Sequence, residues 1–208
     1  MSTLKIYGIP ASRAFRPLWA AHELGLDYEN IPIHYADGSS KTTDFLAINP
    51  NGRIPAMDDD GLILFESMAI TLYLARKHGG GLWPESPADR ARAEQWTFWA
   101  VAEIEKPLIA VIFNRMMLPE DERDEAKAVA AIAEVQAPFR VLDGALAGSD
   151  YLLGERFTVA DLTVAAVMSV AWRCKLDLSA VPNLAAWLVR CLSRPAVAQA
   201  RPDLVVTA

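Results

Sequence analysis

A run of three glycines, Gly79-Gly80-Gly81, separates two parts of the chain whose apolar residues follow different patterns. Before it, short strand-like runs alternate with helical ones in the predicted order β-α-β-α-β-β-α, which implies a mixed sheet with helices packed on it. After it come long helical patterns without a convincing strand. The sequence therefore predicts an α/β domain over 1–82 and an all-α, helical domain over 88–208, joined by the linker "GGGLWPESPAD".

The individual elements follow from the same patterns. In the first domain we expect strands at 4–9, at 28–35 and on both sides of the turn "DDDG". We expect helices at 13–25 and 67–78, and a polar, partly helical stretch that follows the second strand and ends at Ala47. In the second domain we expect helical segments at 88–117, 121–147, 154–172 and 181–200. Thr158 and Asp161 are spaced as a capping box that fixes the start of the third segment, and we assign them no catalytic role.

Composition excludes several classes of function. The 208 residues carry a formal net charge of -6 without a long basic or acidic block, which argues against a nucleic-acid surface and against a polybasic membrane anchor. No stretch is apolar enough to span a membrane, and no export signal is recognisable. Cys174 and Cys191 lie in apolar helical patterns, and the three histidines are isolated, so neither a disulfide nor a metal site is expected. We expect a cytoplasmic protein whose partners are small molecules or another protein chain.

The segment "NPNGRIPAM", residues 49–57, places Pro55 among the apolar residues of a predicted strand. Proline donates no hydrogen bond to a strand ladder and disfavours a helical conformation for the residue before it. The presence of Pro55 in a predicted strand therefore has to be explained. One reading is a trans proline in an edge-strand turn. The other is a cis Ile54-Pro55 bond that leaves the N–H and C=O groups of Ile54 facing outward, where they can hold an extended peptide by β-like hydrogen bonds.

Four stretches, in this order and spacing, resemble the cytosolic glutathione transferases over nearly the whole chain: "PASRAFR" (10–16), "NPNGRIPAM" (49–57), "FESMAITLYLARKH" (65–78) and "LLGERFTVADLTVAAV" (152–167). The resemblance is nearest to bacterial members whose first helix begins with a Ser-Arg pair, and it assigns no class. It implies a thioredoxin-like first domain, an all-α second domain, a cis Pro55, glutathione as co-substrate and a twofold homodimer.

The resemblance also implies which residues hold glutathione. The backbone of Ile54 would bind its cysteinyl unit. Ser67 stands at a predicted helix N-terminus suited to the γ-glutamyl carboxylate, and Glu66 can accept from the ammonium group of the same unit. Arg53 and Lys41 would pair with the glycyl carboxylate, although a solvated surface lysine is an equal reading for Lys41. Ser67 also reads as an ordinary N-cap.

The sulfur of glutathione requires a hydrogen-bond donor that stabilises its thiolate, because the thiolate is the form that attacks an electrophile. Ser12 is a hydroxyl near the start of the first helix, with Arg13 beside it to supply positive potential. Counted from the end of that helix, the family's usual catalytic serine falls on Ala11, one residue earlier. The donor is therefore open among Ser12, a backbone N–H group with Arg13 or Arg16, and Tyr7, while Ser12 also reads as a helix cap.

Aromatic and methionine side chains of the predicted helices suit an adaptable apolar wall for the electrophile. We select Phe15, Phe113 and Met117 for that wall. At helical spacing we expect most of the aromatic and methionine residues of the second domain to be core: Phe98, Trp99, Phe113, Met116, Met117 and Trp172.

The sequence thus predicts a glutathione transferase that ionises glutathione and directs it at an electrophilic small molecule. Two other glutathione-dependent enzymes, an isomerase and a peroxidase, are alternatives. The Ser-Ser-Cys signature of the isomerase branch is not found at "PASRAFR". The first domain contains no cysteine, which speaks against thiol-reducing branches. A binding protein that keeps the fold without turnover is the alternative outside enzymology.

Overall fold

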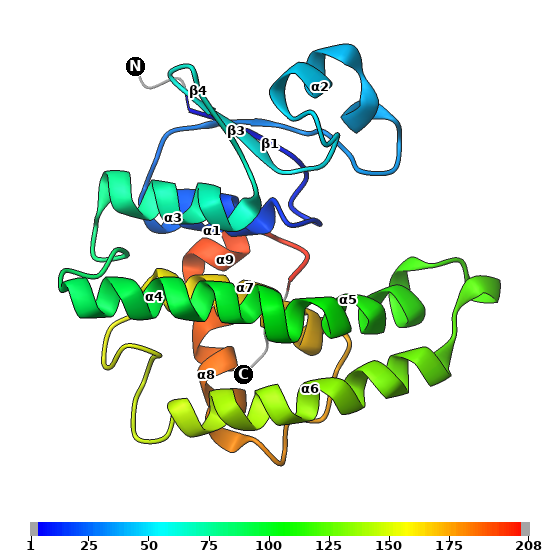
Figure 1. The fold of residues 1–208 in the computed structure, drawn as a ribbon, viewed down its shortest axis with the longest axis vertical. Helices are drawn as coiled ribbons and strands as arrows, with labels where there is room; N and C mark the ends of the chain where they lie inside the picture. The colour runs from blue at the N-terminus through cyan, green and yellow to red at the C-terminus, as the bar shows by residue number, and fades with distance from the viewer. Residues whose placement is uncertain (1–3, 205–208) are drawn as a thin grey trace. The chain divides into compact units, whose positions relative to one another are not determined.

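The computed structural model describes residues 4–204, which form two compact units. The first unit contains a four-stranded sheet in the order β2-β1-β3-β4 (Figure 1). β1 (Lys5–Tyr7) pairs in parallel with β2 (Glu29–Ile31) and antiparallel with β3 (Ala56–Asp59), which pairs antiparallel with β4 (Leu62–Phe65). The predicted order of elements and the mixed sheet are confirmed. The strand expected at 28–35 is shorter than predicted, because Pro32 lacks the N–H group that would continue the ladder.

Helices cover both faces of this sheet, as the alternation of side chains along β1 requires. Ile6 and its partner Met57 are fully buried on one face, where α1 (Phe15–Glu23) and α3 (Ser67–His78) lie (Figure 1). Tyr7 and Ala56 point to the other face, where they pack against α2 (Thr43–Ile48), which follows the short 3₁₀ helix η1 (Ser39–Lys41). The predicted helix at 67–78 is confirmed residue for residue.

A buried carboxylate fastens α3 to β3. Asp59 accepts hydrogen bonds from the Tyr73 hydroxyl at 2.7 Å and from Lys77 Nζ at 2.6 Å. Burial favours the neutral acid, but the hydrogen bonds from Lys77 and Tyr73 outweigh it and hold the pKa of Asp59 below its usual value. Since α3 begins at Ser67, this attachment also fixes where the N-terminus of the helix lies on the sheet.

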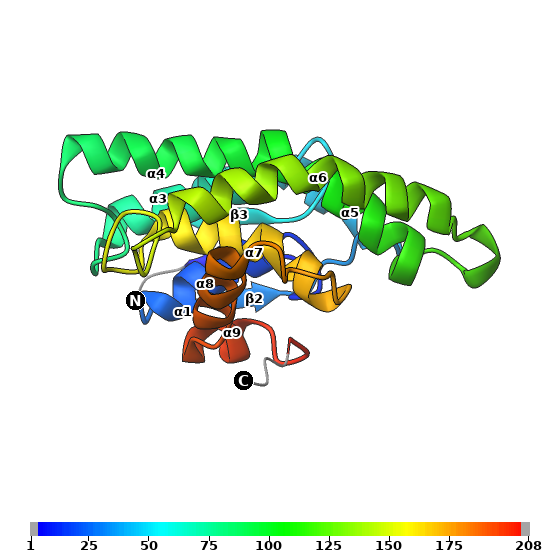
Figure 2. The ribbon, with the colours of Figure 1, turned by 90° about the horizontal axis from the view of Figure 1, so that it is seen from below.

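The second unit, Pro84–Ser193, is helical (Figure 2). The predicted helix at 88–117 is present as a continuous run of α4 (Pro87–Trp99), the π-helical η2 (Ala100–Glu105), α5 (Lys106–Ile112) and the π-helical η3 (Phe113–Met117). The first π segment ends just before Pro107. Proline has no N–H group to donate an α-helical bond to the carbonyl of Glu103, which accounts for the change of helix type at this point. The remaining elements are η4 (Glu120–Glu122), α6 (Glu125–Ala145), α7 (Val159–Arg173) and α8 (Pro182–Leu192).

The predicted capping box at the start of α7 is confirmed. Asp161 Oδ2 accepts from the Thr158 N–H at 2.9 Å and from the Thr158 hydroxyl at 3.1 Å. Its Oδ1 accepts from the Leu152 N–H at 2.8 Å and from Trp187 Nε1 at 3.0 Å. Burial raises the pKa of Asp161, and these donors act in the opposite direction. One carboxylate therefore joins the preceding loop, the start of α7 and α8.

The predicted second domain, 88–208, needs a correction at its C-terminal end. The described residues from 194 onward belong to the first unit, with α9 (Pro195–Ala200) packed on α1. Arg194 donates two hydrogen bonds to the Glu23 carboxylate, at 2.6 and 2.7 Å, and Trp19 Nε1 donates a third at 2.9 Å. Pro195 starts a separate short helix in a stretch that reads as the continuation of α8, which is why the sequence pattern assigned it to the helical domain.

No helix within residues 4–204 combines the length and the apolar composition needed to cross a membrane.

Candidate active site

Three loops leave the sheet of the first unit at the same end. Tyr7, Ala56 and Phe65 form the last paired row of β1, β3 and β4. Because β3 runs antiparallel to both neighbours, the next residues in that direction are Gly8, Pro55 and Glu66. The register thus brings the β1–α1 loop, the Ile54-Pro55 bond and the start of α3 to one edge of the sheet.

The Ile54-Pro55 bond is cis, as predicted. Ladder pairing begins only at Ala56, and within residues 4–204 no hydrogen bond to the backbone of Ile54 is found. Gly8 lies directly against this loop, since a Cβ on Gly8 would be 3.3 Å from the Ile54 Cβ. The edge of the sheet therefore offers a backbone N–H group and C=O group for an extended peptide.

The loop before Pro55 is held from inside by Asn49, which is only 2% exposed. Its Nδ2 donates to the Arg53 carbonyl at 2.6 Å, and its Oδ1 accepts from the Asn51 backbone N–H at 3.1 Å. Lys41 donates through Nζ to the Gly52 carbonyl at 2.7 Å, so its charge is placed on this loop. The Arg53 side chain is exposed and makes no ion pair within the described part of the chain.

The start of α3 has an unusual backbone. Glu66 precedes the helix with φ 72° and ψ 109°, a left-handed conformation that costs a non-glycine residue about 1–3 kcal/mol and is concentrated at functional sites. Glu66 is exposed and makes no side-chain cap, whereas Ser67 is 4% exposed. The Ser67 hydroxyl accepts a hydrogen bond from Arg16 Nη1 at 2.8 Å. Arg16, a candidate for stabilising the sulfur, is thus directed at the helix N-terminus.

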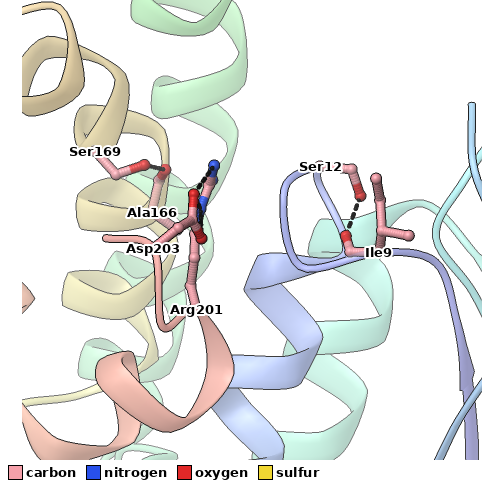
Figure 3. Close-up of polar contacts among 6 residues, drawn as sticks. All are labelled: Ile9, Ser12, Ala166, Ser169, Arg201 and Asp203. Atoms are coloured by element: carbon pink, nitrogen blue, oxygen red, sulfur yellow. Dashed lines mark hydrogen bonds and ion pairs between the residues drawn. The ribbon is translucent and has the colours of Figure 1, made fainter. Parts of the chain in front are cut away.

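Ser12 lies in the turn before α1, and its hydroxyl is engaged locally. It donates to the Ile9 carbonyl at 2.7 Å (Figure 3) and accepts from the Ala14 N–H at 3.0 Å. Ser12 therefore stabilises the turn that precedes the helix, because α1 itself begins at Phe15. Arg13, which follows it, is exposed, as is Ala11.

Tyr7 lies on the face of the sheet that α2 covers. It is 8% exposed, its ring centroid is 6.2 Å from that of Phe45, and it belongs to an apolar cluster with Ala56. Burial, with smaller contributions from Asp58 and Glu29, raises the pKa of Tyr7, which makes its hydroxyl harder to ionise. The position suits a packing role more directly than contact with a ligand.

The expectations for the apolar wall need correction. Phe15 is 2% exposed: its ring stacks on Trp19 with centroids 5.3 Å apart, and the guanidinium of Arg201, which pairs with Asp203 (Figure 3), lies 5.7 Å from the ring centroid. A side chain enclosed in this way cannot line an open surface. Phe113 and Met117, in contrast, are 39% and 38% exposed on η3.

The expectation that most aromatic and methionine residues of the helical unit are core is wrong. Four of the six residues are exposed: Phe98, Phe113, Met116 and Met117. The other two, Trp99 and Trp172, are partly buried. Other large side chains of this unit are fully buried instead: Ile104, Leu108, Phe139, Leu142 and Trp187. Helical spacing alone does not distinguish the two sides of an apolar helix.

Two contacts at this edge were not predicted, the hydrogen bond between Arg16 and Ser67 and the support of the loop by Asn49. The turn signal "NPNG" indicates a tight loop, and with it a structural role for Asn49. No local signal indicates the partner of Arg16, which is 51 residues away in the sequence. Within residues 4–204, no group of three or more histidine, cysteine or carboxylate side chains is placed to hold a metal ion.

Comparison with known proteins gives consistent matches for both units. The chain matches the family descriptions "Glutathione S-transferase, N-terminal domain" over residues 2–76 and "Glutathione S-transferase, C-terminal domain" over residues 105–195. It is 38% identical over 183 residues to glutathione S-transferase GstB of Escherichia coli K12, which covers 86% of this chain and 88% of that protein. It superimposes on the theta class glutathione S-transferase of Xanthomonas axonopodis pv. citri, solved with glutathione bound, with a TM-score of 0.90, 32% identity and coverage of 100% and 99%.

A further match carries a different name. Human elongation factor 1-gamma is 30% identical over 203 residues, which is 94% of this chain but 45% of that protein.

Proposed function

The chain belongs to the glutathione S-transferase family, and we propose that it binds glutathione along the edge of its sheet, ionises the thiol and directs it at an electrophilic small molecule. The observation that carries the proposal is the convergence of Gly8, the Ile54-Pro55 bond and the Glu66-Ser67 pair at one end of the sheet. Once both reactants are held there, proximity supplies much of the rate enhancement. We place this activity in the cytoplasm.

Each part of glutathione has a proposed partner. The unpaired backbone of Ile54 binds the cysteinyl unit, and Pro55 shapes the loop that presents it. The γ-glutamyl carboxylate lies at Ser67 and its ammonium group at Glu66. Arg53 binds the glycyl carboxylate, and its exposed guanidinium supports this assignment. Lys41 contributes charge to the same loop through its bond to the Gly52 carbonyl.

For the sulfur we propose Ser12 as the donor, with Arg13 supplying positive potential. The Ser12 hydroxyl now donates to the Ile9 carbonyl, so it would rotate from that oxygen to the thiolate when glutathione binds. Tyr7 is the second candidate, weakened by its burial against Phe45. For the electrophile we retain Phe113 and Met117, whose exposure fits an apolar wall.

Replacing Ser12 with alanine tests the catalytic half of this proposal. We expect kcat/KM for a chlorodinitrobenzene-type substrate to fall on the order of 100-fold, because a donor that stabilises the reacting anion is lost. Glutathione affinity by calorimetry should change less than about twofold, since Ser12 would contact only the sulfur. Ser179, in an exposed turn of the second unit, gives the matched control as Ser179→Ala.

The outcomes separate the candidates. Unchanged turnover in Ser12→Ala would exclude Ser12 and leave Tyr7, Arg13 or backbone N–H groups. Glutathione binding without turnover in the natural protein would favour a binding protein. Turnover of other glutathione-dependent substrates alone would favour an isomerase or a peroxidase.

We also propose that the protein is a homodimer. Its support is the edge strand β4, where three apolar side chains are exposed, Leu62 at 43%, Ile63 at 39% and Phe65 at 38%. An exposed, apolar edge strand of this kind tends to associate with another protein chain, and a second copy of this chain would cover it. Sedimentation equilibrium should give twice the monomer mass at micromolar concentration. A monomer throughout the accessible concentration range would contradict the proposal.

A further inference from the structure

Arg16 is a buried cation near the proposed glutathione site that the mechanism above does not use. It lies in the first turn of α1, it is 6% exposed, and its Nη1 is 2.8 Å from the Ser67 hydroxyl oxygen. Burying a guanidinium is costly unless its hydrogen bonds are well placed, so its location calls for an explanation. The contact joins the start of α1 to the start of α3, across 51 residues of sequence.

The hydrogen bond sets the direction of the Ser67 hydroxyl. Arginine is a donor only, so Ser67 Oγ must accept from it, and its own proton remains to be donated. Within residues 4–204, no group accepts that proton, and no acceptor is found for the backbone N–H groups of Ser67 and Met68. The start of α3 therefore presents a hydroxyl proton and two N–H groups, with the positive charge of Arg16 behind them.

We propose that Arg16 is a positioning residue for the γ-glutamyl carboxylate, acting through Ser67 without touching the ligand. Arg16 occupies the acceptor side of the Ser67 hydroxyl and so turns its proton toward the carboxylate. The guanidinium also adds positive potential at the helix N-terminus, where an anion is favoured. This inference rests on the proposed function, because it assigns the carboxylate of glutathione to Ser67.

The test compares two ligands by calorimetry in the full-length protein: glutathione, and 4-aminobutyryl-cysteinylglycine, which is glutathione without the γ-glutamyl carboxylate. In Arg16→Met we expect glutathione to bind roughly 10-fold more weakly, the size of effect expected when a charged hydrogen bond is removed. The analogue should bind within about twofold of its affinity for the natural protein, since it lacks the group that Arg16 serves. In a double-mutant cycle, Ser67→Ala with Arg16→Met should lose less than the sum of the single variants.

A merely structural role would weaken both ligands equally, and that result would overturn the inference while leaving the proposed function standing. Additive losses in the cycle would overturn it as well. Absence of glutathione binding by the natural protein would instead reject the proposed function itself. Arg16→Lys serves where Arg16→Met does not fold, as judged by its thermal melting curve. Lysine keeps the charge but lacks the rigid fork, so glutathione should bind with intermediate affinity and the analogue unchanged; equal losses for both ligands would again contradict the inference.

Discussion

Replacing Asp161 with alanine is expected to lower the free energy of unfolding by about 3–5 kcal/mol, because the change leaves several buried donors without an acceptor. The carboxylate, which is fully buried, accepts four hydrogen bonds, from the Leu152 N–H, Trp187 Nε1, the Thr158 N–H and the Thr158 hydroxyl. The hydroxyl can rotate to another acceptor, but the three N–H groups cannot. Urea denaturation followed by circular dichroism measures the loss.

Three further variants identify the source of that loss. Asp161→Asn keeps the shape and one carbonyl acceptor, so it should lose less than the alanine variant. Trp187→Phe removes one of the four hydrogen bonds together with part of a fully buried ring, and should cost about 1–3 kcal/mol. Asp177→Ala is the matched control, because Asp177 accepts from the Ser179 N–H in an exposed turn. A loss below about 1 kcal/mol in Asp161→Ala would show that the donors find other partners.

The sequence predicts those parts of the molecule that local signals determine. The capping box at Thr158 and Asp161, the helix at 67–78 and the cis bond before Pro55 each depend on a few adjacent residues, and all are confirmed. The cis bond needed the family resemblance as well, because the residues alone left a trans proline open. The order of strands and helices follows from periodicity, which is also local.

What the sequence did not predict depends on packing between distant segments. The bond from Arg16 to Ser67 and the attachment of Arg194 to Glu23 join residues far apart in the chain, and neither pair has a distinguishing spacing. The prediction of which apolar side chains are exposed was wrong for the same reason. Phe15 is enclosed by Trp19 and Arg201, but periodicity places it on a helix without indicating what covers it.

The two halves of the proposed site therefore differ in how firmly the backbone fixes them. The glutathione-binding half depends on where Gly8, Ile54 and Ser67 leave or join regular structure, and the sheet register sets these positions. The catalytic half depends on the orientation of the Ser12 hydroxyl, which one bond rotation changes. A change to the backbone at this edge should accordingly affect glutathione binding more than any single side chain there.

Gly8→Ala is expected to produce that effect. Gly8 has φ 138°, a conformation unfavourable for alanine, and an added Cβ would lie 2.8 Å from the Ala14 Cβ and 3.3 Å from the Ile54 Cβ. The methyl group must push the start of α1 away from the Ile54 loop. Since displacement of binding groups by about 1 Å can cost on the order of 100-fold in rate, we expect kcat/KM to fall by that order, with glutathione binding weakened in parallel.

Two controls separate the clash from the backbone conformation. Gly25→Ala also requires a positive φ, of 62°, but its Cβ would meet nothing within 4 Å, so activity should be retained at a modest cost in stability. Ala14→Gly, combined with Gly8→Ala, removes the nearest clashing atom and should restore part of the glutathione affinity measured by calorimetry. If Gly8→Ala binds glutathione as the natural protein does, the loops at this edge adapt without loss. That result would contradict the claim that the fixed backbone positions at this edge limit glutathione binding.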